Sequence, residues 1–421
     1  MRLLSGIPYP WLIVALLAPV ALLNYLDRQM LAAMKFSLMT DLPDIANEAN
    51  WGKILATFKW TYAFLSTLGG YLADRFSRRH VIAASLFAWS AVTWATGQAT
   101  TYDQLLLTRA IMGISEAFYI PAALALITDY HPGSTRSRAV GVHQMGIYAG
   151  VILGGFSGYV ADHPAYGWRF LFSLCGLLGI VYALPLFLAL KNAPRPATSQ
   201  DNNPDKSFQL APLLANPSFL LLAAYFTLPA MAGWIVRDWM PAILKAEFGI
   251  GQGKAGVSAT LYWMLAAIAA AAFGGWLADR WMQKTPRGRI YTSALGVAFM
   301  AIAMMGVGYS PQTGLLPFAI AFLILFGAGW GFFDANNMPI LCQITTPQQR
   351  ATGYGLMNLV SISCGGLADW GFGLLRDAQT PLLTIFALFA TVTLLSVALV
   401  LAIKPAEPTA APNSPKSHPA S

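Results

Sequence analysis

The chain has 421 residues, of which 56% are hydrophobic and only 10% are charged, and its formal net charge is +8. A soluble domain usually carries about 25% charged residues, so this composition excludes an ordinary soluble protein. The three cysteines are widely spaced in apolar runs, which indicates neither a disulfide framework nor a metal site. The sequence therefore predicts an all-α protein that crosses the lipid bilayer many times and has no metal or other cofactor.

Twelve apolar stretches are long enough to cross a bilayer core, which takes about 20 residues of helix. In chain order they cover residues 10–38, 52–73, 80–99, 103–129, 138–161, 168–190, 217–246, 254–278, 290–309, 315–342, 351–375 and 380–403. Polar, proline-rich segments separate the sixth stretch from the seventh and end the chain. We expect two six-helix halves over residues 1–190 and 213–403, a cytoplasmic linker over 191–212, and a disordered cytoplasmic tail over 404–421.

Basic residues are concentrated in alternate short loops, and such loops face the cytoplasm by the positive-inside rule. Arg78, Arg136, Arg280 and Arg350 belong to this set, whereas acidic residues gather in the loops between. We therefore expect both termini in the cytoplasm. Because topology accounts for most of the net charge, no nucleic-acid partner is needed to explain it.

Short motifs recur at a nearly constant offset along the chain. The segment GGYLADRFSRR (69–79) recurs as GGWLADRWMQK (274–284), and GISEAFYIP (113–121) matches GFFDANNMP (331–339). These matches indicate two homologous halves in parallel repetition. Transporters built in this way bind substrate near the membrane midplane between the halves, and they expose the site to each side in turn.

Charged side chains share one helix face in the first and fourth spans. Asn24, Asp27 and Arg28 stand at i, i+3 and i+4, and Arg109 and Glu116 at i and i+7. Charges at this depth cost several kcal/mol and are usually functional. Carboxylates away from water favour their neutral form, so the two acids suit reversible proton carriage. The structural alternative is a buried ion pair that only holds helices together.

Other basic side chains, and Asn24 of the first span, are placed to meet an anionic substrate. Lys59 and Tyr62 stand almost one turn apart in the second span, and Arg109 lies in the outer half of the fourth. Together with Lys35 and Arg237, they suggest a positive vestibule that attracts anions from outside. The two lysines could instead extend to the outer interface.

The second half contains neutral polar side chains that suit the hydroxyl groups of a sugar. Asn336, Asn358 and Ser361 offer such donors and acceptors, and the last two share a helix face. Hydrogen bonds between helices are the alternative role. Asp334 repeats the position of the fourth-span glutamate, and Asp369 is a further acid within a span; the sequence assigns neither a role.

The repeated LADR motifs lie where their spans leave the membrane on the cytoplasmic side. They are therefore placed to form charge pairs that hold one conformation, and not to touch a substrate. The residues expected to gate in this way are Asp74, Arg75, Arg78, Asp279 and Arg280.

The GxLADR element in both halves resembles the cytoplasmic signature of the major facilitator superfamily over the whole membrane region. NYLDR in the first span, FKWTYAFLSTLGGYLADR (58–75) and TRAIMGISEAFYIPAAL (108–124) resemble its anion:cation symporter group. That group includes bacterial galactonate and hexuronate transporters and animal sialic-acid and vesicular glutamate carriers. The resemblance implies the fold of the superfamily, proton coupling through Asp27 and Glu116, and contact of Arg28 with the substrate carboxylate. It also implies that Tyr62 faces the substrate and that the protein lies in the inner membrane of a bacterium.

The expected function is proton-coupled symport, by a monomer, of a small organic anion such as a hexuronate or an aldonate. Importing one negative charge against an interior-negative potential costs about 2.3 kcal/mol per 100 mV, and an accompanying proton removes that cost. The alternatives are an exporter or exchanger of an amphipathic drug or a monocarboxylate, and a transporter-like receptor. The sequence does not separate proton from sodium coupling. It contains no HExxH, GxSxG or Walker A motif, so an enzyme is not expected.

Overall fold

The computed structural model describes residues 8–131, 135–192, 210–346 and 349–405, without the side chains of residues 67–75, 137, 210 and 351. Most of the expected linker and tail therefore lies outside the described residues, as do the side chains of Asp74 and Arg75.

Helices make up nearly all of the described chain, as expected from the apolar runs. The first group is α1 (Tyr9–Ala33), α2 (Lys35–Asp41), the 3-10 helix η2 (Pro43–Ala46), α3 (Glu48–Arg75), α4 (Arg78–Thr96), α5 (Tyr102–Glu116), α6 (Tyr119–Tyr130), α7 (Arg136–Gly155), α8 (Ser157–Ala161) and α9 (Gly167–Ala189). The second group is α10 (Leu210–Leu214), α11 (Pro217–Phe248), α12 (Gln252–Met282), α13 (Gly288–Thr313), α14 (Leu316–Ile344), α15 (Arg350–Asp377) and α16 (Leu382–Ala402).

Nine helical spans in the described residues are long and apolar enough to cross a membrane, by length and composition. The helices α3, α4 and α15 have 28, 19 and 28 residues and are comparably long but more polar. With them, the membrane-length segments are consistent with the twelve predicted spans. The polarity of α3 and α15 has a structural reason, because these two helices pack against each other between the two groups.

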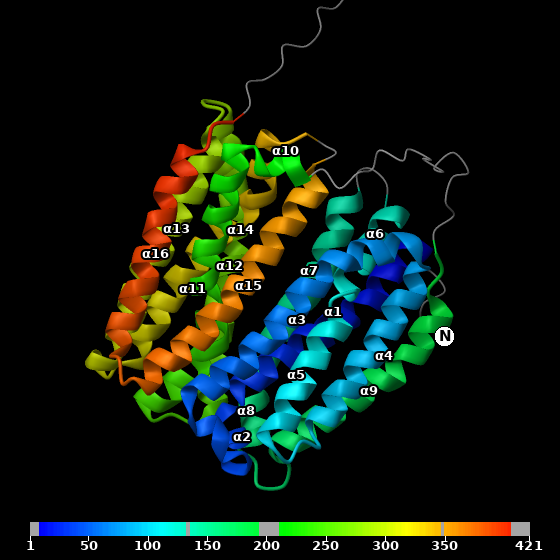
Figure 1. The fold of residues 1–421 in the computed structure, drawn as a ribbon, viewed down its shortest axis with the longest axis vertical. Helices are drawn as coiled ribbons and strands as arrows, with labels where there is room; N and C mark the ends of the chain where they lie inside the picture. The colour runs from blue at the N-terminus through cyan, green and yellow to red at the C-terminus, as the bar shows by residue number, and fades with distance from the viewer. Residues whose placement is uncertain (1–7, 132–134, 193–209, 347–348, 406–421) are drawn as a thin grey trace, which may run out of the picture.

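The two groups of helices lie side by side and make their close contacts towards one end of the bundle (Figure 1). We call this the α2 end, after the helix that lies there, and the opposite end the α10 end. At the α2 end, α3 packs on α15, and α12 packs on α7 and α8. A Cβ atom at Gly256 of α12 would overlap the carbonyl oxygen of Gly155, and one at Gly52 would overlap that of Asp369. Glycines thus allow the two halves to close at this end.

We expect Gly256→Trp to hold the α2 end apart, because the indole needs the space that the backbone of α7 occupies. The matched control is Gly275→Trp on the same helix, where an added Cβ meets nothing within 4 Å. Spin labels at His163→Cys and Ala246→Cys, in a variant without the native cysteines, report the separation of the halves. The distance should lengthen only in the first variant. Equal distances in both variants would contradict the proposed packing.

Candidate functional site

The charged residues of the first and fourth spans lie together in the structure. Arg28 Nε of α1 donates to Glu116 Oε2 of α5 at 2.7 Å, and its Nη2 lies 2.6 Å from the same oxygen. Arg109 Nη1 lies 3.7 Å from Asp27 Oδ1, and the hydroxyl of Thr93 also donates to Asp27. The two acids are almost completely buried, at 2% and 0% exposure. They form two cross-helix pairs between α1 and α5.

A break in the fourth span places Glu116 at the end of a helix. The sequence predicts one continuous span here, but α5 ends at Glu116 and α6 begins at Tyr119. Pro121 explains the break, because proline has no N–H to donate to the carbonyl of Ala117. Gly113 brings α5 against α3, since a Cβ there would overlap the Thr61 hydroxyl.

Aromatic rings from two helices surround the guanidinium of Arg28. Its Cζ lies 4.8 Å from the ring centre of Tyr25, 4.7 Å from Phe58 and 4.8 Å from Tyr62. A cation over aromatic faces is held electrostatically while its edge stays available for hydrogen bonds. Tyr62, expected to face the substrate, therefore stands beside the expected anion-binding arginine.

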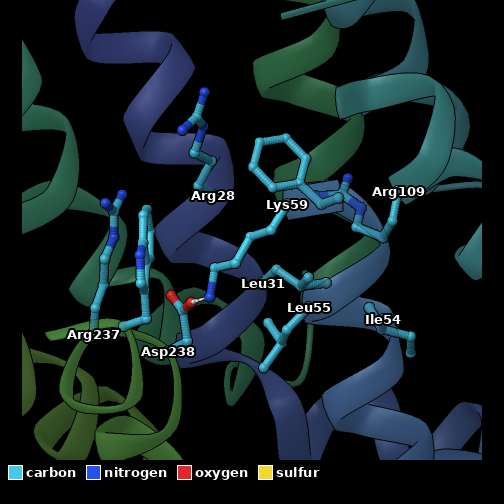
Figure 2. Close-up of a pocket in the computed structure, with 10 residues that line it drawn as sticks. Arg28, Leu31, Ile54, Leu55, Lys59, Arg109, Arg237 and Asp238 are labelled. Atoms are coloured by element: carbon cyan, nitrogen blue, oxygen red, sulfur yellow. Dashed lines mark hydrogen bonds and ion pairs between the residues drawn. The ribbon is translucent and has the colours of Figure 1, made fainter. Parts of the chain in front are cut away.

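A pocket opens between these residues and the second group of helices (Figure 2). Four basic side chains, one acid and five apolar residues line it: Arg28, Lys59, Arg109, Arg237, Asp238, Leu31, Ile54, Leu55, Phe58 and Trp234. Three of the four basic side chains are paired with acids within the described chain. The fourth, Arg237, has no such pair within the described residues, and it makes the pocket suited to an anion.

Arg237 differs from the other three basic residues, because no carboxylate in the described part of the chain forms an ion pair with it. Its guanidinium lies over the rings of Tyr25 at 5.0 Å and Trp234 at 5.4 Å. Its Nη2 is buried and has no hydrogen-bond partner. An anion in the pocket would supply the missing acceptor.

Lys59 is held by two acids from the opposite half of the molecule. Its ammonium donates to Asp238 of α11 and to Asp369 of α15, and it lies 4.4 Å from the ring centre of Trp234. Lys35 pairs with Glu48, an acid of its own half. In this structure Lys35 and Lys59 are 3% and 2% exposed. The sequence analysis overlooked Asp238, although an acid directly after an arginine inside a span was a visible signal.

The other predicted binding residues are spread more widely. Asn24 is buried, and neither polar atom of its amide has a partner. Asn336 donates to the carbonyl of Phe332 at 2.8 Å, and Asn358 to that of Tyr354 at 3.1 Å. These two amides and Ser361 are not among the residues that line the pocket. Their predicted contact with a substrate stays a prediction.

The gating residues that the structure describes form contacts within their own half at the α10 end. Arg78 pairs with Asp129 and also donates to the carbonyl of Ala125 at 3.2 Å. Asp279 lies 3.6 Å from Arg289, and Arg280 is exposed. The hydrogen bonds that join the halves involve other residues. In the first half these are residues 29–60 and 162, and in the second half residues 237–252 and 363–377.

Comparison with known proteins now decides the family. The family model described as Major Facilitator Superfamily matches residues 17–368. The chain belongs to the major facilitator superfamily. Its family and its fold are those of multi-pass membrane transporters, as the sequence predicted. Within the described residues, no group of three or more His, Cys, Asp or Glu side chains is arranged to hold a metal ion.

Two individual proteins are similar to this chain over different shares of its length. Protein spinster homolog 1 from Homo sapiens is 32% identical over 255 residues, which are 57% of this chain and 47% of that protein. The match thus spans about half the length of that relative. The hexuronate transporter of Bacillus subtilis is 25% identical over 340 residues, covering 75% of this chain and 79% of that protein. The sequence analysis anticipated the second resemblance but not the first.

Solved structures show the same fold. A bacterial homolog of the human lysosomal transporter Spinster, in an inward-facing and occupied conformation, superimposes with a TM-score of 0.75 at 21% identity. The alignment covers 94% of this chain and 96% of that one. A D-xylose–proton symporter gives 0.72 at 17% identity, over 94% and 98% of the two chains. The helices of this chain therefore have the arrangement of the superfamily.

Proposed function

We propose that this transporter imports a small organic anion together with a proton, by alternate opening of its α10 and α2 ends. The observation that carries the proposal is the shared position of Arg28, which contacts Glu116 and also lines the pocket. A substrate carboxylate and Glu116 would compete for one guanidinium. When the substrate takes Arg28, the buried glutamate loses its partner and favours the protonated form.

Arg237 supplies a second guanidinium from the opposite half. Arg28 of α1 and Arg237 of α11 both line the pocket, and both lie over the ring of Tyr25. An anion bound between them would connect the two halves by charge-assisted hydrogen bonds, which are about twice as strong as neutral ones. The halves could then rock around the bound anion, as parallel-repeat transporters do.

A sugar acid is the proposed substrate, and the proton is the proposed coupling ion. The similarity to a hexuronate transporter over 79% of that protein supports the first. The two buried acids beside two arginines support the second. One proton with each monovalent anion would make the cycle electroneutral and still use the pH gradient. The asparagines and Ser361 of the second half are proposed to meet the sugar hydroxyls after a conformational change.

The α10 end is proposed to face the cytoplasm of a bacterial cell. Arg78, Arg280, Arg289 and Arg350 belong to helix ends on this side, as the positive-inside rule requires. Since the halves are joined at the α2 end, the structure represents a state closed to the outside. A monomer contains both halves and suffices for this cycle.

Uptake by purified protein in liposomes tests the proposal. With an inward pH gradient, we expect uptake of glucuronate, galacturonate, galactonate or gluconate that collapses with a protonophore. Lactate, an anion without a sugar, tests the need for the sugar part, and glucose, a sugar without a charge, tests the need for the carboxylate. Octanoate is included because half of the pocket lining is apolar. Uptake of octanoate or of an amphipathic cation alone would overturn the sugar-acid assignment.

A further inference from the structure

A second group of buried charges lies at the boundary between the halves. It is separate from the ion pairs that Asp27 and Glu116 form with arginines. Lys59 of α3 is 2% exposed, and its two partners Asp238 of α11 and Asp369 of α15 are 8% and 0% exposed. The lysine belongs to one half and both acids to the other, and α11 packs directly on α15. We propose that Asp238 and Asp369 form a proton-binding site that Lys59 occupies as a tethered cation while the α2 end is closed.

Two carboxylates share one ammonium in this group, and Arg237, next to Asp238 in the chain, forms no ion pair with either of them within the described residues. Asp369 Oδ1 is buried without a hydrogen-bond partner, so the site retains an acceptor that Lys59 does not use. An uncompensated buried carboxylate is costly unless it is paired or neutralised. The two carboxylates are therefore arranged to bind a cation, and the ammonium of Lys59 occupies that position in this structure.

Opening of the α2 end must remove that ammonium. Gly52 and Trp60 of α3 pack against Asp369 and Gly366 of α15, so the two helices separate as this end opens. Lys59 leaves with α3, while both acids stay together in the other half. Two carboxylates held close together without their cation repel each other, so one of them takes up a proton. When α3 returns, the ammonium pairs with both carboxylates again, and the proton leaves to water in the pocket that Asp238 lines.

Charged side chains from several packed elements surround the pair, and α14, which packs on both α11 and α15, adds the acid Asp334. The other basic side chains on the wall next to Asp238 come from α1, α5 and α11, and α16, which packs on α11, has no titratable residue. Acids nearer the surface of the α2 end also join the halves, through Asp162 to Gln252 and through Asp377 to the backbone of Glu48. The charged groups to consider are Arg28, Lys59, Arg109, Arg237, Lys35, Glu48, Asp162, Asp334 and Asp377.

The inference rests on the alternating access proposed above, but not on the identity of the substrate. Its test therefore uses no substrate. The spin-label pair at His163→Cys and Ala246→Cys, on the full chain in lipid nanodiscs, reports the α2 end between pH 8 and pH 5. Acid should raise the ratio of open to closed molecules, by at most about tenfold per pH unit for one proton.

Variants separate this site from the other acids. We expect Asp369→Asn to open the α2 end at every pH and to remove the pH response, and Asp238→Asn to do the same if the first variant does not fold. Asp377→Asn, at an exposed acid on the same helix, should change the baseline and keep the response.

Several outcomes would overturn the inference. They are a wild-type α2 end that does not respond to pH, a response that survives in Asp369→Asn and Asp238→Asn, and opening by sodium at fixed pH instead of by acid. A response that survives in Asp369→Asn and Asp238→Asn but is lost in Glu116→Gln would assign this proton uptake to Glu116 and leave the proposed function intact. Failure of sugar-acid uptake, with the pH response of Asp369 present, would overturn only the substrate assignment.

Discussion

Replacing Arg28 by alanine is expected to weaken substrate binding by about 30-fold or more. Removing one partner of a buried charge pair costs about 2–5 kcal/mol, and each 1.4 kcal/mol corresponds to about tenfold in affinity. The variant also leaves Glu116 buried without its guanidinium, so that acid should become neutral. Isothermal titration of the purified variant with the sugar acid found by the uptake assay measures the effect.

Two further variants make this result specific. Arg28→Lys keeps the charge but loses the planar group that lies over Tyr25, Phe58 and Tyr62, so its affinity should fall between wild type and alanine. Arg289→Ala removes a partly exposed arginine at the α10 end and should bind normally. Normal affinity in a folded Arg28→Ala variant would show that the anion binds elsewhere.

Asp27→Asn and Glu116→Gln are expected to reduce accumulation driven by a pH gradient at least tenfold. The reason is that neither amide can take up and release a proton in the cycle. Counterflow of labelled substrate should persist, since exchange needs only the return of loaded carriers and no deprotonation. Glu116→Gln should also free Arg28 and make substrate affinity independent of pH. Liposome uptake and counterflow, at matched amounts of folded protein, measure the two quantities.

The same two variants distinguish a role of these acids in proton coupling from a role in protein stability alone. If both variants lost counterflow, surface expression and thermal stability together, the acids would be structural ion pairs between α1 and α5. Asp129→Asn is a matched control, because it removes an acid that pairs with Arg78 near the α10 end, away from the pocket. It should retain gradient-driven accumulation.

Local periodicity was enough to find the acids and arginines of the first and fourth spans, but not their pairing. The sequence placed Asp27 beside Arg28 and Glu116 on the face of Arg109. The structure pairs Arg28 with Glu116 and Arg109 with Asp27. Neighbouring residues on a helix point about 100° apart, and residues seven apart are two turns away, so partners come from the other helix.

The contacts between the halves could not be read from the sequence. Lys59 lies 179 residues from Asp238 and 310 from Asp369, and no helical spacing relates them. The sequence therefore assigned Lys59 to the substrate, whereas its ammonium is held by two acids in this conformation. The break after Glu116 was missed for another reason. Pro121 was visible, but proline kinks are common in membrane helices and did not by themselves indicate where a helix ends.

Proton movement caused by the substrate is the most direct test of the central claim. Liposomes that contain the protein and a trapped pH dye are prepared without any gradient, and the sugar acid is added outside. The account predicts that the interior acidifies in step with substrate uptake, and that Glu116→Gln shows no such acidification. Substrate uptake by the wild-type protein at constant internal pH would contradict it.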